Sequence, residues 1–258
     1  MSDFTSINTR PGGKGLFNAN TLRALACLFM VSDHLWATIV PGNMWMNYVG
    51  RLAFPIFAFQ ISEGYRHTSD FGRYARRLLV FGLISEIPFN LMYAGGFFFP
   101  FHQNVMFTLL LGLLSIRAID TIRQNFSARQ SFKTQIRPVF TLAGCLLLAA
   151  VGFVDYGFWG VLTVILFHVL RGFRGAWLLQ LAAMVYIHCE AYKGMFIPVE
   201  LLGHSFEFAT QGFAVLALPL IWLYNGKKGR SSKALQYGFY AFYPVHMLVL
   251  ALVRMYIL

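Results

Sequence analysis

Four ionisable side chains within apolar stretches are the residues of this sequence best suited to chemistry. Asp33 and His34 are neighbours in the run FMVSDHLWATI, Arg51 lies in the next apolar run, and His246 lies in the last one. Charged and titratable groups are expensive in a hydrocarbon core, so those that occur there usually face the protein interior. Histidine exchanges protons near neutral pH, and arginine presents fixed donors to a negative charge. The four residues therefore predict either a site for proton or group transfer or, alternatively, ion pairs that hold helices together.

The composition is that of an integral membrane protein. Of the 258 residues 57% are hydrophobic and only 12% are charged, and the mean hydropathy is +0.58. We predict an all-α, polytopic helical bundle, in which residues 1–20 form a short cytoplasmic tail and residues 21–258 a single transmembrane domain. About nine spans of bilayer-crossing length are expected, at 21–40, 45–63, 76–94, 104–122, 138–154, 156–171, 174–190, 206–224 and 236–256.

The distribution of charge predicts the topology. The net charge is +11, and most of the 21 lysine and arginine residues fall in connections that share one side of the membrane if the N-terminus is cytoplasmic. The connections on the other side carry the acidic residues Asp155, Glu190, Glu200 and Glu207. This pattern predicts a multi-pass protein of the cell (inner) membrane with a cytoplasmic N-terminus. The basic balance therefore indicates contact with a lipid bilayer and no nucleic-acid partner.

Helix geometry predicts a common depth for several of the polar residues. At about 1.5 Å per residue, His34, Arg51 and His246 all lie roughly 20 Å from the cytoplasmic boundary. Asp33 adjoins them, and Glu86 lies nearer the middle of the membrane. Successive residues of a helix point about 100° apart, so one of the neighbours Asp33 and His34 can face Arg51 while the other faces a cavity. We expect His34 to face the cavity.

Metal and disulfide chemistry are not indicated. Cys27, Cys145 and Cys189 are odd in number and far apart, which argues against a disulfide framework and against a metal site. The histidines of the apolar stretches show no metal-ligand spacing. At the cytoplasmic end of the second span, Glu63 and Arg66 are close enough to pair across a helical turn. We therefore expect no metal in this protein.

An ordered set of short stretches resembles a known family. Together they resemble the TraX family, whose type activity is acetylation of the N-terminus of a conjugative pilin, and which is similar to the wider group of transmembrane acyltransferases. No single stretch is specific, but the set runs in family order along nearly the whole chain. The stretches are MVSDHL at 30–35, VGRLAFPIFAF at 49–59, NVMFTLLLG at 104–112, DYGFWGVL at 155–162 and FYPVHMLVLALV at 242–253.

The resemblance implies an acyltransferase that takes its acyl group from acetyl-CoA and uses no metal. It implies His34 as the base, with Asp33 supporting the local charge. Arg51 would stabilise the oxyanion or hold the acceptor, and His246 would relay a proton or contact the acceptor. The acceptor would belong to the cell envelope, as a pilin N-terminus or a surface glycan does. Residues expected to bind the acceptor are Asn104 and Tyr156, with Glu86 and Glu63 as weaker candidates, and those expected near the CoA phosphates are Arg66, Arg73, Arg76 and Arg77.

Two other classes of function remain open on the sequence. A proton-coupled transporter or permease also uses His, Asp, Glu and Arg at mid-membrane, and broken helices or an internal repeat would favour it. The second class is a non-catalytic assembly factor for surface structures, in which the polar residues only pack the bundle.

Overall fold

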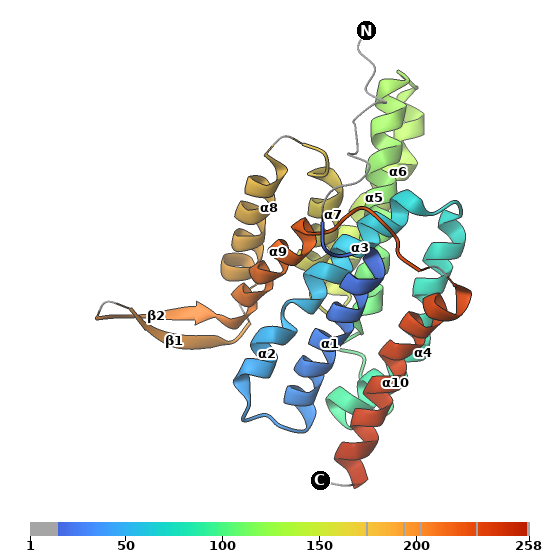
Figure 1. Ribbon diagram of the computed structural model, residues 1–258. Coiled ribbons are helices and arrows are strands. Elements are labelled where there is room, and N and C mark those ends of the chain that lie inside the picture. The colour runs from blue at the N-terminus through green and yellow to red at the C-terminus, as the bar shows by residue number, and fades with distance from the viewer. Residues whose placement is uncertain (1–14, 174, 193, 202, 231, 257–258) are drawn as a thin grey trace.

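The computed structural model describes residues 15–173, 175–192, 194–201, 203–230 and 232–256, and most of them are helical. Figure 1 shows the helices gathered in one bundle, from which a β-hairpin projects on one side. In chain order the elements are α1 (Ala19–Thr38), α2 (Met44–Gly50), α3 (Ala53–His67), α4 (Phe71–Ala94), α5 (Val105–Ser127), α6 (Phe132–Val151), α7 (Gly157–Val169), α8 (Ala176–Val185), the π-helical turn η1 (Tyr186–Ala191), β1 (Phe196–Leu201), β2 (His204–Ala209), the 3₁₀ turn η2 (Thr210–Leu216), α9 (Ala217–Trp222) and α10 (Lys233–Tyr256).

The core forms where α1 and α3 meet the surrounding helices. Helix α1 packs against α2, α3 and α10, whereas α3 packs against α5 and α7 as well as α1. The side chains of Leu22, Ile56 and Met247 are fully buried in this core. Small residues allow close approach between the helices: a Cβ atom added to Gly112 of α5 would lie 2.7 Å from a methyl carbon of Val164 in α7.

Among the described residues, four helices are long and apolar enough to cross a membrane: α4, α5, α6 and α10. Shorter apolar helices occupy Gly157–Val169, Ala176–Ala191 and Thr210–Trp222. The prediction of a helical membrane protein is therefore confirmed in outline. The total of about nine spans and the cytoplasmic N-terminus stay predictions.

The predicted span at 45–63 is divided in the structure into two helices that meet at Arg51. Helix α2 ends at Gly50, and α3 begins at Ala53. A proline has no N–H to donate and its ring crowds the carbonyl four residues earlier, so Pro55 removes a helical hydrogen bond at Arg51. The break turns the Arg51 side chain into the space between α1 and η2, where its partners lie.

The predictions of an all-α chain and of a helix from residue 206 are wrong. Strands β1 and β2 pair in antiparallel register, from Phe196 opposite Ala209 to Leu201 opposite His204. The turn contains Gly203 with φ +80°, a backbone conformation that glycine adopts readily. Polar and apolar residues alternate in SFEF at 205–208, which is the period of a strand and a signal that the hydropathy of the segment obscured.

Candidate functional site

The first polar cluster joins α1 to the broken helix. Asp33 Oδ1 accepts hydrogen bonds from Arg51 Nη2 at 2.7 Å and from Asn47 Nδ2 at 2.8 Å. A Cβ atom added to Gly50 would lie only 2.3 Å from the Cβ of Asp33, so glycine is required for α2 to come this close to α1. The Asp33 carboxylate therefore holds the arginine and accepts a second hydrogen bond from the Asn47 amide.

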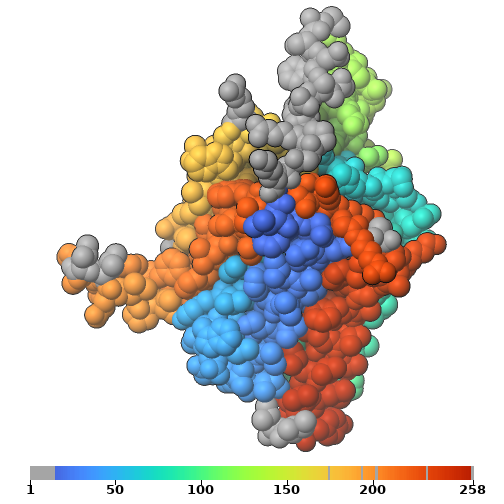
Figure 2. Space-filling model, viewed as in Figure 1, coloured from blue at the N-terminus to red at the C-terminus, as the bar shows by residue number. Residues whose placement is uncertain are grey.

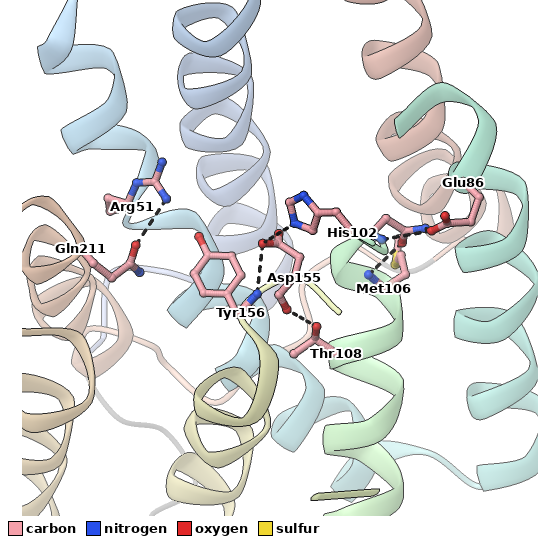
Figure 3. Close-up of polar contacts among 9 residues, drawn as sticks. Arg51, Glu86, His102, Met106, Thr108, Asp155, Tyr156 and Gln211 are labelled. Carbon is pink, nitrogen blue, oxygen red and sulfur yellow. Dashed lines mark hydrogen bonds and ion pairs between the residues drawn. The ribbon is translucent and has the colours of Figure 1, made fainter. Parts of the chain in front are cut away.

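From Arg51 the polar contacts continue toward the base of the hairpin. Arg51 Nη1 donates to Gln211 Oε1 at 3.3 Å, as Figure 3 shows, and the Gln211 amide lies 3.2 Å from His188 Nδ1. Gln211 and His188 are almost fully buried. Among the described residues neither Arg51 Nε nor His188 Nε2 has a hydrogen-bond partner. A buried, unpartnered donor on a fixed cation is suited to receive a negatively charged oxygen.

The second cluster is a pair of histidines, His34 on the adjacent face of α1 and His246 on α10. His34 Nδ1 lies 2.7 Å from His246 Nε2, and the two rings are nearly parallel, with an interplanar angle of 8°. His246 Nδ1 lies 2.8 Å from the backbone oxygen of Phe242. A carbonyl oxygen can only accept, so in the neutral pair His246 carries its proton on Nδ1 and accepts at Nε2 from His34. The ring nitrogen left with a free lone pair is then His34 Nε2, so this atom can accept a proton as a base.

Tyr156 lies beside the Arg51 cluster at the start of α7. Its ring stacks on Phe54 with centroids 3.8 Å apart and on Tyr192 with centroids 5.6 Å apart. Its backbone N–H donates to Asp155 Oδ1 at 3.0 Å, and that oxygen lies 3.5 Å from His102 Nε2. Figure 3 shows the Tyr156 ring between the Arg51–Gln211 contact and Asp155. An aromatic wall therefore adjoins the arginine.

Asn104 and Glu86 occupy a different position, between α4 and the start of α5. Asn104 caps α5, because its Oδ1 accepts from Met106 N at 3.0 Å. Its Nδ2 donates to the Gly82 carbonyl at 2.9 Å and also contacts Glu86 Oε1, which accepts from Asn104 N at 3.0 Å. Figure 3 shows Glu86 on the side of this region away from Arg51. These contacts occupy the whole Asn104 amide and indicate that it ties two helices together.

A cavity of about 600 Å³ opens between α1, α3, α4 and α10. Leu78, Met106 and Leu109 line an apolar part of it. The Arg77 guanidinium in its wall lies over the rings of Tyr74 and Tyr240. Its basic lining residues are Arg23, Arg73, Arg77, Lys228 and Arg230. The cavity thus combines a cluster of cations with an apolar lining.

The other predicted residues divide between this cavity and elsewhere. Glu63 lines it but is ion-paired with Arg171. Arg66 lines a separate cavity of about 620 Å³ that Asp120 also lines. Arg76 is exposed and lines neither. In the part of the chain that the structure describes, no group of histidine, cysteine and acidic residues is arranged to hold a metal ion.

Several residues of the site were not predicted. Asn47, Gln211, His188 and Tyr192 all come from segments that read as apolar or as connections. For Asn47 and Gln211 the available signal was an isolated amide in an apolar stretch, since such groups need a partner inside a membrane protein.

Comparisons with known proteins give a family and a relative. The family model described as "TraX protein" matches residues 18–254. The chain is 29% identical over 254 residues to "Probable fimbrial assembly protein FimC, serogroup H1" of Dichelobacter nodosus, a match that covers 93% of this chain and 97% of that protein. No solved structure matches the chain at a significant level.

Proposed function

The chain belongs to the TraX family, and on this premise we propose that it is a membrane-embedded acyltransferase. It transfers an acetyl group from cytoplasmic acetyl-CoA to an acceptor of the cell envelope, a pilin N-terminus or a surface glycan. The observation that carries the proposal is the His34–His246 pair beside the Arg51–Asp33 ion pair. The relative named for fimbrial assembly supports an acceptor that becomes part of a surface fibre.

In this mechanism His34 is the base. Its Nε2 takes a proton from the acceptor amine or hydroxyl while that group attacks the carbonyl carbon of the thioester. The positive charge that forms on His34 is shared with His246, whose Nε2 lies 2.7 Å away and can receive the Nδ1 proton. The new bond to the acceptor forms, the carbon–sulfur bond breaks, and the CoA thiolate leaves with the proton that His34 releases.

Arg51 stabilises the oxyanion of the tetrahedral intermediate. Its Nε is buried without a partner among the described residues, so a donor is free for the developing negative oxygen. Asp33 fixes the guanidinium through Nη2, and Gln211 accepts from Nη1. Both act on the reaction through Arg51 and are positioning residues.

The cavity between α1, α3, α4 and α10 is the donor site. Arg23, Arg77 and Arg230 are suited to bind the phosphates of CoA, because guanidinium groups match phosphate oxygens in charge and geometry. Tyr240 lines the cavity and precedes His246 by six residues of α10, or about 9 Å along the helix. The thioester end of a donor held at the basic lining is directed along α10 toward the histidine pair.

The proposal is tested with purified protein in nanodiscs, radiolabelled acetyl-CoA and a cell-envelope extract. His34→Ala is expected to lower transfer about 100- to 10,000-fold, and Arg51→Lys should also lower it strongly while donor binding is kept. Arg77→Ala should weaken binding of acetyl-CoA, whereas the exposed Arg76→Ala is its matched control. If the wild-type protein neither binds acetyl-CoA nor releases CoA in the presence of the extract, the proposal fails.

Proton-coupled transport is a second candidate, and the broken helix at Arg51 favours it. Half-helices that meet at a polar residue form binding sites in membrane transporters. This alternative predicts a pH-dependent solute flux in proteoliposomes that His34→Ala abolishes, with no acetyl transfer. A non-catalytic assembly factor predicts neither activity, and fibre assembly in cells would then survive His34→Ala.

A further inference from the structure

The hairpin of β1 and β2 projects from the bundle as a two-stranded sheet, and Figure 2 shows it extending beyond the surface of the helices. A two-stranded sheet leaves one edge of each strand without a neighbour, and such edges offer backbone N–H and C=O groups to another extended chain. With the N-terminus cytoplasmic, as the charge distribution predicts, the hairpin lies on the extracytoplasmic side. The two edges differ in the backbone N–H groups that they present.

The pairing register identifies the outward groups of each strand. Thr210 N donates to the Met195 carbonyl at 2.8 Å, so these opposite residues form a hydrogen-bonded pair. Hydrogen-bonded and non-bonded pairs alternate in antiparallel strands, so Pro198 opposite Glu207 is a non-bonded pair whose backbone groups point outward. On β1 the outward residue Pro198 has no N–H, so another chain cannot form a continuous row of hydrogen bonds along that edge. On β2 the outward residues Ser205 and Glu207 keep their N–H groups. Among the described residues these N–H groups donate to no backbone carbonyl outside the hairpin.

The free edge of β2 leads into the polar site. Gln211 follows the strand by two residues and accepts from Arg51, and Tyr192 precedes the hairpin and stacks on Tyr156. At about 3.4 Å per residue, Glu207 is at most roughly 14 Å along the chain from Gln211. A segment bound along β2 and antiparallel to it would have its N-terminal residues directed toward Arg51.

The negative charge of the hairpin favours the binding of a positively charged polypeptide N-terminus. The two strands contain Glu200 and Glu207 and no lysine or arginine. Both glutamates are exposed and belong to non-bonded pairs, so they lie on the same face of the sheet. A free α-amino group is positively charged at neutral pH until a base removes its proton. The acidic face therefore attracts the group that is to be acylated.

We infer that the outer edge of β2 is the docking site of a polypeptide acceptor, which adds to it as a third, antiparallel strand and presents its α-amino group to the His34–His246 pair. The inference rests on the proposed acyltransferase function and selects a protein as its acceptor class. A glycan has no row of backbone donors and acceptors with which to match a strand edge.

The test compares proline at matched outward positions of the two strands. Glu207→Pro removes an outward N–H from the β2 edge, and Glu200→Pro removes the equivalent group from the β1 edge; both delete one glutamate and leave the pairs within the hairpin intact. Glu207→Gln removes the charge alone. Each protein in nanodiscs receives radiolabelled acetyl-CoA and a cell-envelope extract, and protease-sensitive label in the extract is measured together with acetyl-CoA binding.

We expect Glu207→Pro to lower label in protein by about three- to tenfold, whereas Glu207→Gln and Glu200→Pro, which each remove one charge of the acidic face and keep the N–H groups of the β2 edge, should have a smaller effect. Acetyl-CoA binding should be unchanged in all of them, which also reports that the bundle is folded. Equal transfer by Glu207→Pro and Glu200→Pro would overturn the inference. Label only in protease-resistant glycan would overturn it and leave the acyltransferase intact, whereas no transfer in any fraction would refute the proposed function itself.

Discussion

Asp33 and His34 are neighbours on α1, yet their surroundings differ in kind. Asp33 is in an ion pair with Arg51 and accepts a further bond from Asn47. His34 donates to a second histidine through one hydrogen bond, and that proton can pass to His246 once His34 gains a proton on Nε2. The first cluster depends on an ion pair that holds α1 against α2, whereas the second contains two imidazole rings joined by a hydrogen bond. A single turn of helix thus carries both a rigid anchor and a proton-exchanging pair, which is what group transfer requires.

The largest expected effect on stability comes from breaking the anchor. Asp33→Ala leaves the Arg51 cation largely buried without its partner and should lower the free energy of unfolding by about 3 kcal/mol. SDS titration of the protein in mixed micelles measures this change. The control is Arg73→Ala, whose ion pair with Asp70 is exposed and contributes less than about 1 kcal/mol. Equal losses in the two variants would show that the Asp33 pair is no anchor.

Removal of the proposed proton relay, His246, should affect activity more than stability. His246→Phe keeps an aromatic ring beside Phe242 but removes the partner of His34, and kcat for acetyl transfer should fall about 100-fold. The unfolding midpoint should remain close to that of the wild type. His102→Phe, at a histidine of the separate Asp155 contact, is the matched control and should retain activity. A drop in kcat that merely follows a loss of folded protein would remove the distinction between the two clusters.

The close approach of α1 and α2 is tested by Gly50→Ala. The added methyl group would overlap Asp33, and the displacement should lower the free energy of unfolding by about 2 kcal/mol. Activity should fall in parallel because Arg51 follows Gly50 directly. Gly144→Ala in α6 meets no atom within 4 Å and should be neutral or stabilising. A stable, active Gly50→Ala protein would mean that the two helices separate without consequence.

The smallest expected effect comes from the link between the anchor and the hairpin. Gln211→Ala removes the hydrogen-bonding amide between Arg51 and His188, with a loss of about 1 kcal/mol in unfolding free energy. Gln180→Ala, which removes an exposed hydrogen bond from Trp222, should change stability by less than about 0.5 kcal/mol. If Gln211→Ala also weakens acceptor binding, the Ser205 and Glu207 amides of the variant should exchange hydrogen faster than those of the wild type when acceptor is present.

Prediction from the sequence succeeded where one local signal was sufficient. Long apolar stretches identified α4, α5, α6 and α10, because crossing a bilayer requires length and hydropathy alone. It failed where two signals competed. The hydropathy of 45–63 concealed the effect of Pro55 on the carbonyl of Arg51, and the hydropathy of 206–224 concealed a strand. The role of Asn104 in binding stays a prediction, and in the structure its amide caps α5 and contacts Glu86.

The sequence by itself determined that polar groups are buried in a membrane bundle and that Asp33 and His34 must point in different directions. It did so because apolar length and helical periodicity are local properties. Only the tertiary structure decided which partner each of them meets: Arg51 for Asp33, and His246 for His34. Those partners are 18 and 212 residues away, and their contacts depend on how a broken helix and a distant one pack against α1. Packing also brought Gln211 and the hairpin to Arg51. The energy of a buried donor depends on which acceptor reaches it, and that acceptor is selected by the packing of distant segments.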